Sequence, residues 1–324
     1  MAEWDPELEE LHLRETLAER MGGQEKVTRQ HDRGKLDIRQ RLDLLLDDDS
    51  FHEVGKIAGT ASYDDDGKLV DLRASNFVFG RGLVDGCPVV VAGDDFTVRG
   101  GAADASIVTK QIAAEHMAFE LRLPIIRLID GTGGGGSVKT LDTKAQSSGS
   151  VATGSMGRGA RTYVPANPAW EHVVANLATV PTVALCLGPV AGLGAARAVS
   201  SHFSVMIRGL SQLFVAGPPV VNALGAEEVD KESLGGSGIH TRNGAIDHAV
   251  DSEEEAFEAA RRFLSYLPSS VHQLAERGSV TDDPDRRDDL LADIVPRNRR
   301  HVYKMRTIIE SVVDQDSFFE TGAA

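Results

Sequence analysis

The spacing of apolar residues along the chain predicts most of its secondary structure. Leucines fall at helical intervals over residues 4–46, with charges between them, and predict a helical arm. Over residues 77–98, two β-rich runs meet at Asp85-Gly86, a dipeptide typical of a tight hairpin turn. The later elements follow in order: a helix at 106–123, a strand at 124–130, a helix at 167–179, a strand at 182–187, a helix at 194–201, a strand at 203–209, and helices at 218–225 and 252–267.

Strands that alternate with helices predict an α/β core whose strands pair at least partly in parallel. Within residues 301–320 the pattern predicts a short amphipathic helix and the start of a strand. We therefore divide the chain into a helical arm (1–60), an α/β domain (61–275), and a linker that leads into the beginning of a second domain (276–324).

The composition is that of an ordinary globular chain of 324 residues, of which 41% are hydrophobic and 26% charged. The formal net charge of -15 argues against binding to nucleic acid, which depends on clustered lysine and arginine. The most basic window, TRQHDRGKLDIRQRL at 28–42, fits either an anion site or a solvated helix face.

Cys87 and Cys186 both lie inside apolar runs, so we expect two small buried side chains and neither a metal site nor a disulfide framework. The N-terminus is acidic and lacks the apolar run of a targeting signal, and nowhere do about 18 apolar residues follow one another. These features predict a cytoplasmic protein without a membrane span.

Two glycine-rich loops follow predicted strands, and both are candidates for binding negative charge. The run GTGGGG at 131–136 satisfies the dinucleotide pattern G-x-G-x-x-G, but a poor helix start follows it and no acid lies about 20 residues on. In VALCLGPVAGLGAAR at 183–197, Arg197 occupies the place of the third glycine or alanine. The P-loop pattern and the nucleophile elbow G-x-S-x-G are absent. A dehydrogenase is therefore the least supported function.

Backbone amides at Gly192, Leu193 and Gly194 lie where a buried strand turns into a helix, and such amides attract negative charge. With no dedicated nucleophile beside them, they suit an oxyanion hole. There, two amides stabilise the charge that builds on a thioester oxygen when a neighbouring proton leaves. Alternatively, the glycines serve only the geometry of a tight strand-to-helix connection.

Four stretches of the chain carry a family resemblance. They are RGKLDIRQRLDLLLDDDSFHEVG, VVVAGDDFTVRGGAADA, LGPVAGLGAARAVSSHF, and EEVDKESLGGSGIHTRNGAIDHAV followed by FLSYLPSS. Through them the sequence resembles the β, or carboxyltransferase, subunit of biotin-dependent acyl-CoA carboxylases such as those acting on propionyl-CoA. That family is a branch of the crotonase superfamily. The resemblance implies a crotonase/ClpP-like spiral of β-β-α units behind the helical arm.

Members of that family consist of two related halves, and the present chain resembles the first. The resemblance implies that this half binds an acyl-CoA and that a second half supplies most of the biotin site. A carboxyl group then moves from carboxybiotin to the α-carbon of the CoA thioester. The implied partners are a second carboxyltransferase half, a biotin carboxylase or biotin carrier subunit, and further copies in an oligomer. Biotin would arrive on a partner protein, and a lone half would lack turnover.

By the same resemblance, the amides of Gly192 and Leu193 face the enolate oxygen, although the family usually has a second glycine where this chain has Leu193. The loop DGTGGGGS resembles the family's Asp-Ser-Gly-Gly-Ala-Arg but lacks the arginine. The implied substrate contacts in glycine-rich loops are Gly133, Gly134, Gly194, Gly235 and Gly236. His240 completes the family's LGG-x-x-x-H pattern, and we expect a buried structural histidine there instead of a general base.

Three basic side chains, Arg33, Lys35 and Lys110, are candidates to meet the CoA phosphates, with plain solvent exposure as the alternative for each. Two rival functions also stay open. A CoA-ester decarboxylase component would use the same oxyanion hole, and a noncatalytic acyl-CoA-binding or scaffold subunit would keep the fold without the chemistry.

Overall fold

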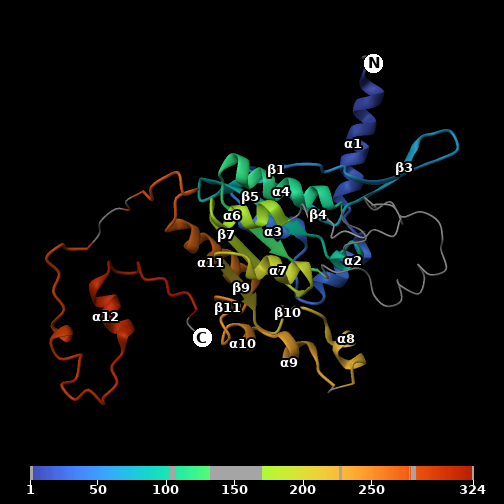
Figure 1. Cartoon of the computed structure of the whole chain (residues 1–324). Helices are drawn as coiled ribbons and strands as arrows, with labels where there is room; N and C mark the ends of the chain where they lie inside the picture. The colour runs from blue at the N-terminus through green and yellow to red at the C-terminus, as the bar shows by residue number, and fades with distance from the viewer. Residues whose placement is uncertain are drawn as a thin grey trace.

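A seven-stranded sheet forms the centre of the computed structural model, which describes residues 3–102, 107–131, 170–225, 228–276, 278 and 282–322 (Figure 1). In spatial order its strands are β1 (His52–Glu53), β4 (Phe77–Val84), β5 (Cys87–Asp94), β6 (Ile125–Ile129), β7 (Thr182–Cys186), β9 (Phe203–Ile207) and β11 (His248–Val250). From β5 to β11 neighbouring strands run parallel, whereas β1, β4 and β5 pair antiparallel. The predicted α/β fold is confirmed.

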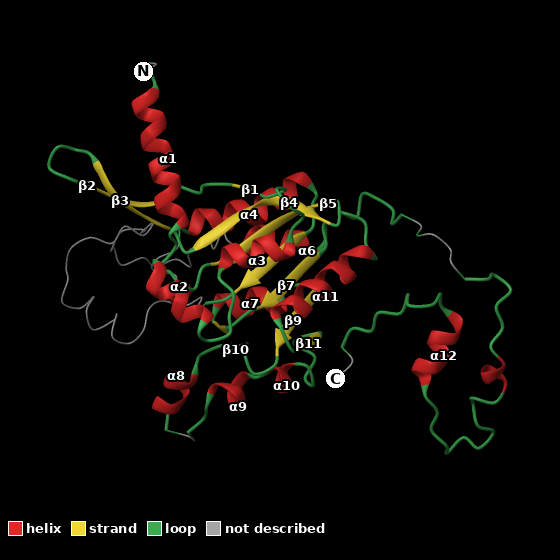
Figure 2. Ribbon diagram, turned by 180° about the vertical axis from the view of Figure 1, so that it is seen from behind, coloured by secondary structure: helices red, strands yellow, loops and turns green. Residues whose placement is uncertain are grey.

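Helices cover both faces of this sheet (Figure 2). The two faces are set by the alternation of side chains along each strand. Val89 and Val91 of β5 belong to a core cluster shared with α3 (Ile38–Leu45) and α11 (Glu253–Ser265). Val90 of the same strand faces the opposite way, toward α4 (Val108–Leu121). Because helices lie on both sides, β6, β7 and β9 are buried along their whole length, which explains their mostly apolar sequence; Arg127, Thr182 and Ser204 are buried polar exceptions.

The structure divides the predicted helical arm between a projecting part and a core part. α1 (Asp5–Glu19) extends away from the sheet, next to the hairpin of β2 (Gly59–Tyr63) and β3 (Leu69–Ala74) (Figure 1). α2 (Gln24–His31) follows, and then α3 places its apolar side chains in the main core of the α/β domain. The helical region therefore ends inside that domain, while the exact division at residue 60 stays a prediction.

The hairpin predicted at Asp85-Gly86 is confirmed. Val84 pairs with Cys87 across a two-residue turn, and both turn residues have positive φ, 50° and 78°. This is the left-handed backbone that the turn requires, and aspartate and glycine tolerate it best. The carboxylate of Asp47 accepts hydrogen bonds from both turn amides, at 3.0 and 2.8 Å, and fixes the turn against the end of α3.

The other predicted elements of the core are confirmed with shifts of a few residues at their ends, including α6 (Glu171–Leu177) and α7 (Leu193–Val199). The sequence did not predict a small parallel pair between β8 (Pro189–Ala191) and β10 (Gln212–Phe214). Three short helices complete the lower part of the domain in Figure 1: α8 (Pro218–Ala223), α9 (Lys231–Gly235) and α10 (Ser237–His240).

In Figures 1 and 2, α12 (Met305–Val312) lies apart from the sheet, whereas the chain after it returns to the domain, where Phe319 packs against Phe203 of β9 and His248 of β11. The expected helix is present, but the expected strand start is wrong, because residues 313–322 form turns and irregular structure. Among the helices that the structure describes, none is both long and apolar enough to cross a membrane.

One of the two cysteines differs from expectation. Cys186 is fully buried in β7, but Cys87 is exposed because it begins β5 directly after the hairpin turn. Burial also raises the pKa of the Cys186 thiol to about 12.

We expect the two thiols to react with a disulfide reagent at very different rates, because the thiolate is the reactive form and the reagent must reach it. In the native protein at pH 8, one thiol per chain should react rapidly, and Cys87→Ser should remove that phase. The second thiol should appear only when urea unfolds the chain. Two rapid thiols in the native protein would contradict the buried position of Cys186.

Candidate functional site

The loop between β7 and α7 contains the predicted oxyanion donors, and β8 fixes its course. Gly192 has φ 64° and ψ -125°, a conformation open to glycine and costly for other residues. Its amide donates to the carbonyl of Phe214 on β10, at 3.1 Å. The N–H of Gly192 is therefore satisfied in this structure, and its role as an oxyanion donor stays a prediction that would need this hydrogen bond to be shared or broken. Gly192 also turns the chain so that the next residues begin α7.

Leu193 and Gly194 occupy the first two positions of α7, where backbone amides have no partner within the helix. No hydrogen bond joins either amide to another described residue. The Leu193 side chain is about half exposed, whereas Gly194 is buried. A Cβ on Gly194 would lie 3.0 Å from Val190, so glycine lets α7 pack closely on β8. The donors that remain for an oxyanion are the amides of Leu193 and Gly194.

The other predicted glycine contacts have different positions. Gly133 and Gly134 lie outside the described residues. Gly235 ends α9, and a side chain there would overlap the carbonyl of Leu213 on β10. Gly236 forms a β-bridge with Gln212, and Nε2 of His240 donates to the same Leu213 carbonyl, at 2.9 Å. These three residues support β10, which in turn fixes the Gly192 turn, and a direct substrate contact for the two glycines stays a prediction.

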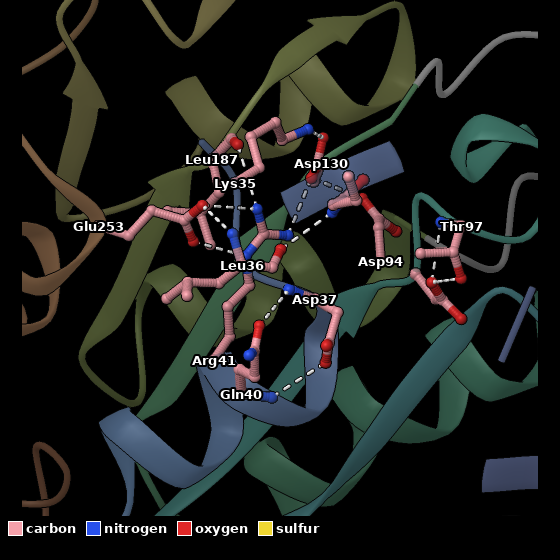
Figure 3. Close-up of polar contacts among 12 residues, drawn as sticks. Lys35, Leu36, Asp37, Gln40, Arg41, Asp94, Thr97, Asp130, Leu187 and Glu253 are labelled. Atoms are coloured by element: carbon pink, nitrogen blue, oxygen red, sulfur yellow. Dashed lines mark hydrogen bonds and ion pairs between the residues drawn. The ribbon is translucent and has the colours of Figure 1, made fainter. Parts of the chain in front are cut away.

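The basic window at 28–42 separates into buried and exposed cations. Lys35 donates from Nζ to Oδ1 of Asp130 at 2.6 Å, and Arg41 donates from Nη1 to Oδ2 of the same carboxylate at 2.8 Å (Figure 3). Arg41 also forms a two-pronged contact with Glu253, at 2.6 and 3.0 Å. All four side chains are buried. We call Lys35, Arg41, Asp130 and Glu253 the buried ion-pair network.

This arrangement changes the expected role of Lys35. Its ammonium group is bound to Asp130 and lies 4.3 Å from the centre of the Phe96 ring. Burial lowers the pKa of Lys35, and the Asp130 carboxylate opposes that shift. The structure therefore places Lys35 in an internal ion pair, and a contact with a CoA phosphate stays a prediction that would need this pair to be shared or broken.

The buried ion-pair network also reaches the glycine loop. The amide of Asp130 donates to the Asp94 carboxylate at 3.2 Å, and Arg197 on α7 lies 3.9 Å from the other oxygen of Asp94. Burial raises the pKa of Asp94, and Arg197 partly offsets that rise. Gly188 passes so close that a Cβ would overlap Asp130 and Lys35. The ends of β5, β6 and β7 are thus joined by polar contacts, which extend to Arg197 in the last turn of α7.

The exposed cations gather on another surface. Lys26, Arg29, Arg33 and Arg99 line a pocket of about 230 Å³, together with Gln30, Phe96, Thr97 and Gly100. Arg29 forms a solvent-exposed pair with Glu25, and such pairs contribute little stability. Several cations around one aromatic ring and a glycine backbone make a surface that suits a phosphorylated nucleotide group. We call these four cations and their pocket the basic pocket, and Arg33 is the predicted phosphate residue that belongs to it.

Lys110 has a third environment. Its side chain is buried against Phe79, with Nζ 6.0 Å from the ring centre, so the alternative of plain solvent exposure is wrong. Burial lowers the pKa of Lys110 to about 8; Glu53 opposes this shift, whereas Arg39 adds to it. Arg39 holds the Glu53 carboxylate at 2.6 Å, so Glu53 is not a dedicated partner for the lysine.

A buried lysine with a lowered pKa makes the stability of the protein depend on pH. Between about pH 8 and the ordinary value of 10.5, the unfolded chain holds this proton and the folded chain does not, so stability rises with pH across that window. Between pH 7.5 and pH 10, the rise relative to Lys110→Met should be about 2 kcal/mol. Urea unfolding of both proteins at pH 7.5 and pH 10 measures it. Equal changes in the two proteins would mean that Lys110 is not desolvated.

Sequence patterns missed the acidic members of this region. Asp94 ends β5, Asp130 follows β6, and Glu253 begins α11. Nothing local marks Asp130 and Glu253 as partners of Lys35 and Arg41, or Asp94 as a partner of Arg197. The available signal was positional: Asp94 and Asp130 come at the carboxyl ends of apolar strands that the pattern predicts to be parallel neighbours. Such ends meet at one edge of a sheet.

Comparison with known proteins gives a family match over most of the chain. The model of the carboxyl transferase domain matches residues 29–324. The carboxyltransferase subunit of propionyl-CoA carboxylase from Haloferax mediterranei is 31% identical over 313 residues, which cover 96% of this chain and 57% of that protein. The alpha subunit of methylmalonyl-CoA decarboxylase from Veillonella parvula is 28% identical over 321 residues, covering 99% of this chain and 59% of the relative.

Solved structures agree with the sequence match. Transcarboxylase 12S, described as a hexamer assembly with hydrolysed methylmalonyl-coenzyme A bound, superposes with a TM-score of 0.79 at 27% identity. The match covers 98% of this chain and 58% of that one. The crotonase-like carboxyltransferase fold expected from the resemblance is therefore confirmed. The chain spans somewhat more than half the length of these relatives.

Proposed function

The chain belongs to the carboxyl transferase domain family, and on that premise we propose that it is the acyl-CoA-binding half of a biotin-dependent carboxyltransferase. The observation that carries the proposal is the family match over residues 29–324, with relatives that act on CoA esters. The reaction would move a carboxyl group from carboxybiotin to the α-carbon of a short acyl-CoA.

The start of α7 supports the chemistry of this reaction. Removing a proton from the α-carbon of a thioester moves negative charge onto the carbonyl oxygen, and preoriented amides lower the energy of that enolate by several kcal/mol. The amides of Leu193 and Gly194 have no hydrogen bond to a described residue and start a helix, whose dipole adds to the effect. The buried ion-pair network holds the neighbouring strand ends in place.

The basic pocket supports recognition of the CoA portion. A coenzyme A ester carries phosphate groups at its nucleotide end, and Arg33 and its neighbours give a positive surface in a chain whose net charge is -15. The positive pocket would also attract the anionic substrate to one region of a protein whose net negative charge otherwise repels it.

The companion half and the biotin partner belong to the proposal. Because the chain spans about 57–59% of the relatives, we propose that a second carboxyltransferase half completes the active site. Carboxybiotin, attached to a biotin carboxylase or carrier protein, would supply the carboxyl group. The residues of this chain would bind the thioester, orient its carbonyl and keep water from the enolate. An oligomer, as in the transcarboxylase 12S hexamer, and a cytoplasmic location are part of the same proposal.

A decarboxylase component is the second candidate, because one relative of nearly full coverage is the alpha subunit of a methylmalonyl-CoA decarboxylase. The same amides would hold the same enolate, with the carboxyl group moving from the CoA ester to biotin. The two functions differ in the direction of transfer, so assays in both directions distinguish them.

The decisive experiment combines the full chain with its companion half, a carboxybiotin donor, and acetyl-CoA or propionyl-CoA. Carboxylated product that depends on the chain supports the transferase, and carboxyl loss from methylmalonyl-CoA without the forward reaction supports the decarboxylase. Acyl-CoA binding with no turnover in either direction would identify a noncatalytic subunit. Absence of acyl-CoA binding would overturn the proposal.

A further inference from the structure

A small cavity lies directly beside the candidate oxyanion donors. It has a volume of about 20 Å³ and is lined by Gln111, Glu115, Trp170, Leu193 and Arg197. Gln111 and Glu115 come from α4, Trp170 precedes α6, and the other two belong to α7. Leu193 thus contributes in two ways, because its main-chain amide is a candidate donor and its side chain is a wall of the cavity. A thioester oxygen bound at that amide would place its acyl group within a few bonds of this space.

Two walls of the cavity are held by buried polar contacts. Both oxygens of Glu115 accept from Arg127, at 2.8 and 2.9 Å, and one also accepts from Asn176 at 2.9 Å. Arg197 is held near Asp94 at 3.9 Å. Moving Glu115 would leave the fully buried Arg127 without its carboxylate, which is strongly unfavourable. The cavity therefore cannot widen on these sides at low energetic cost.

The size and polarity of the cavity restrict what fits. A space of 20 Å³ is close to the room that one water molecule needs, which is also about the size of one methyl group. A longer alkyl chain would have to displace Leu193 or Trp170, or press against the charged groups of Glu115 and Arg197 and strip them of water. Leu193 is the easier of the two apolar walls to change, because its side chain is half exposed and makes no hydrogen bond.

We propose that Leu193 and Trp170 limit the acyl group to two or three carbons, so that acetyl and propionyl esters fit and butyryl and longer esters do not. This inference rests on the proposed function. It adds that the leucine between the glycines of the loop selects chain length, while its amide serves the carbonyl oxygen. A glycine at the same position would keep the amide and lose the wall.

The experiment measures binding by calorimetry, so it needs no companion half. Wild-type chain, Leu193→Ala and Leu193→Phe are titrated with CoA and with its acetyl, propionyl, butyryl and hexanoyl esters. The wild type should bind butyryl-CoA at least about tenfold more weakly than propionyl-CoA, because one excess methylene against the walls of a pocket is rejected by that order. In Leu193→Ala, butyryl-CoA should bind as tightly as propionyl-CoA. In Leu193→Phe, propionyl-CoA should weaken relative to acetyl-CoA.

Val199→Ala is the matched control, because Val199 is an equally exposed apolar residue at the other end of α7 and does not line the cavity. It should leave the ratios between the affinities for the different esters unchanged. Binding of CoA itself should be the same in all four proteins. If all esters bind but the Leu193 variants show the same ratios between ester affinities as the wild type, the inference is overturned and the proposed function stands. If neither CoA nor any ester binds to the wild type, the proposed function itself fails.

Discussion

Replacing Arg41 by methionine is expected to lower the free energy of unfolding by about 3–5 kcal/mol. Arg41 has no exposed surface and neutralises two buried carboxylates, those of Asp130 and Glu253. Without the guanidinium group, Lys35 alone balances two negative charges, and Glu253 loses its ion-pair partner. A methionine of similar length fills the space, so the loss reports the missing charge and hydrogen bonds. Urea unfolding at pH 7 measures the difference.

Arg29→Met serves as the control for Arg41. Arg29 comes from the same basic window, but it forms an exposed pair with Glu25, and exposed pairs contribute between about 0 and 1 kcal/mol. If both substitutions cost the same, the buried ion-pair network does not stabilise the fold as its geometry implies.

Changing Gly192 to alanine is expected to weaken the binding of propionyl-CoA by at least about tenfold, which corresponds to 1.4 kcal/mol. The φ and ψ values of Gly192 are accessible to glycine and strained for alanine by about 1–3 kcal/mol. Relief of that strain would break the bond to Phe214 and rotate the amides of Leu193 and Gly194, which follow it directly. Calorimetry with propionyl-CoA measures the binding, and urea unfolding measures the accompanying loss of stability.

Gly209→Ala separates loss of the site from general strain. Gly209 also has positive φ, 69°, and no atom lies within 4 Å of the position where its Cβ would be. It should lose stability to a similar extent and keep its affinity for propionyl-CoA. Equal loss of affinity in both variants would show that strain anywhere in the domain disturbs binding, and that the turn at Gly192 has no special role.

The sequence was sufficient for the main elements because their signals are local. β6, β7 and β9 are mostly apolar runs, and the turn at Asp85-Gly86 has residues that accept positive φ. The strands β8 and β10, of three residues each, carry no such signal. Since their pairing occupies the Gly192 amide, only the structure could show that Leu193 and Gly194 have the loop amides without a hydrogen bond to a described residue.

Local sequence patterns also could not predict which basic residues in the window at 28–42 are buried and which are exposed. Lys35, Arg41 and Arg33 look alike in the sequence, yet the first two are buried and the third is exposed. What distinguishes them is contact with Asp130 and Glu253, acids that come about 90 to 210 residues later in the chain. The family resemblance, in contrast, depends on ordered motifs and needed no knowledge of such contacts.

Contact between Arg41 and Glu253 also bears on how the protein is made. The two residues are 212 positions apart, and ribosomes add about 5–20 residues per second, so roughly 10–40 s pass between their synthesis. During that interval the apolar leucines of α3 have no finished sheet to pack on, and the neighbouring guanidinium stays in water. We therefore expect the nascent chain to expose this apolar face until α11 emerges and the core can close.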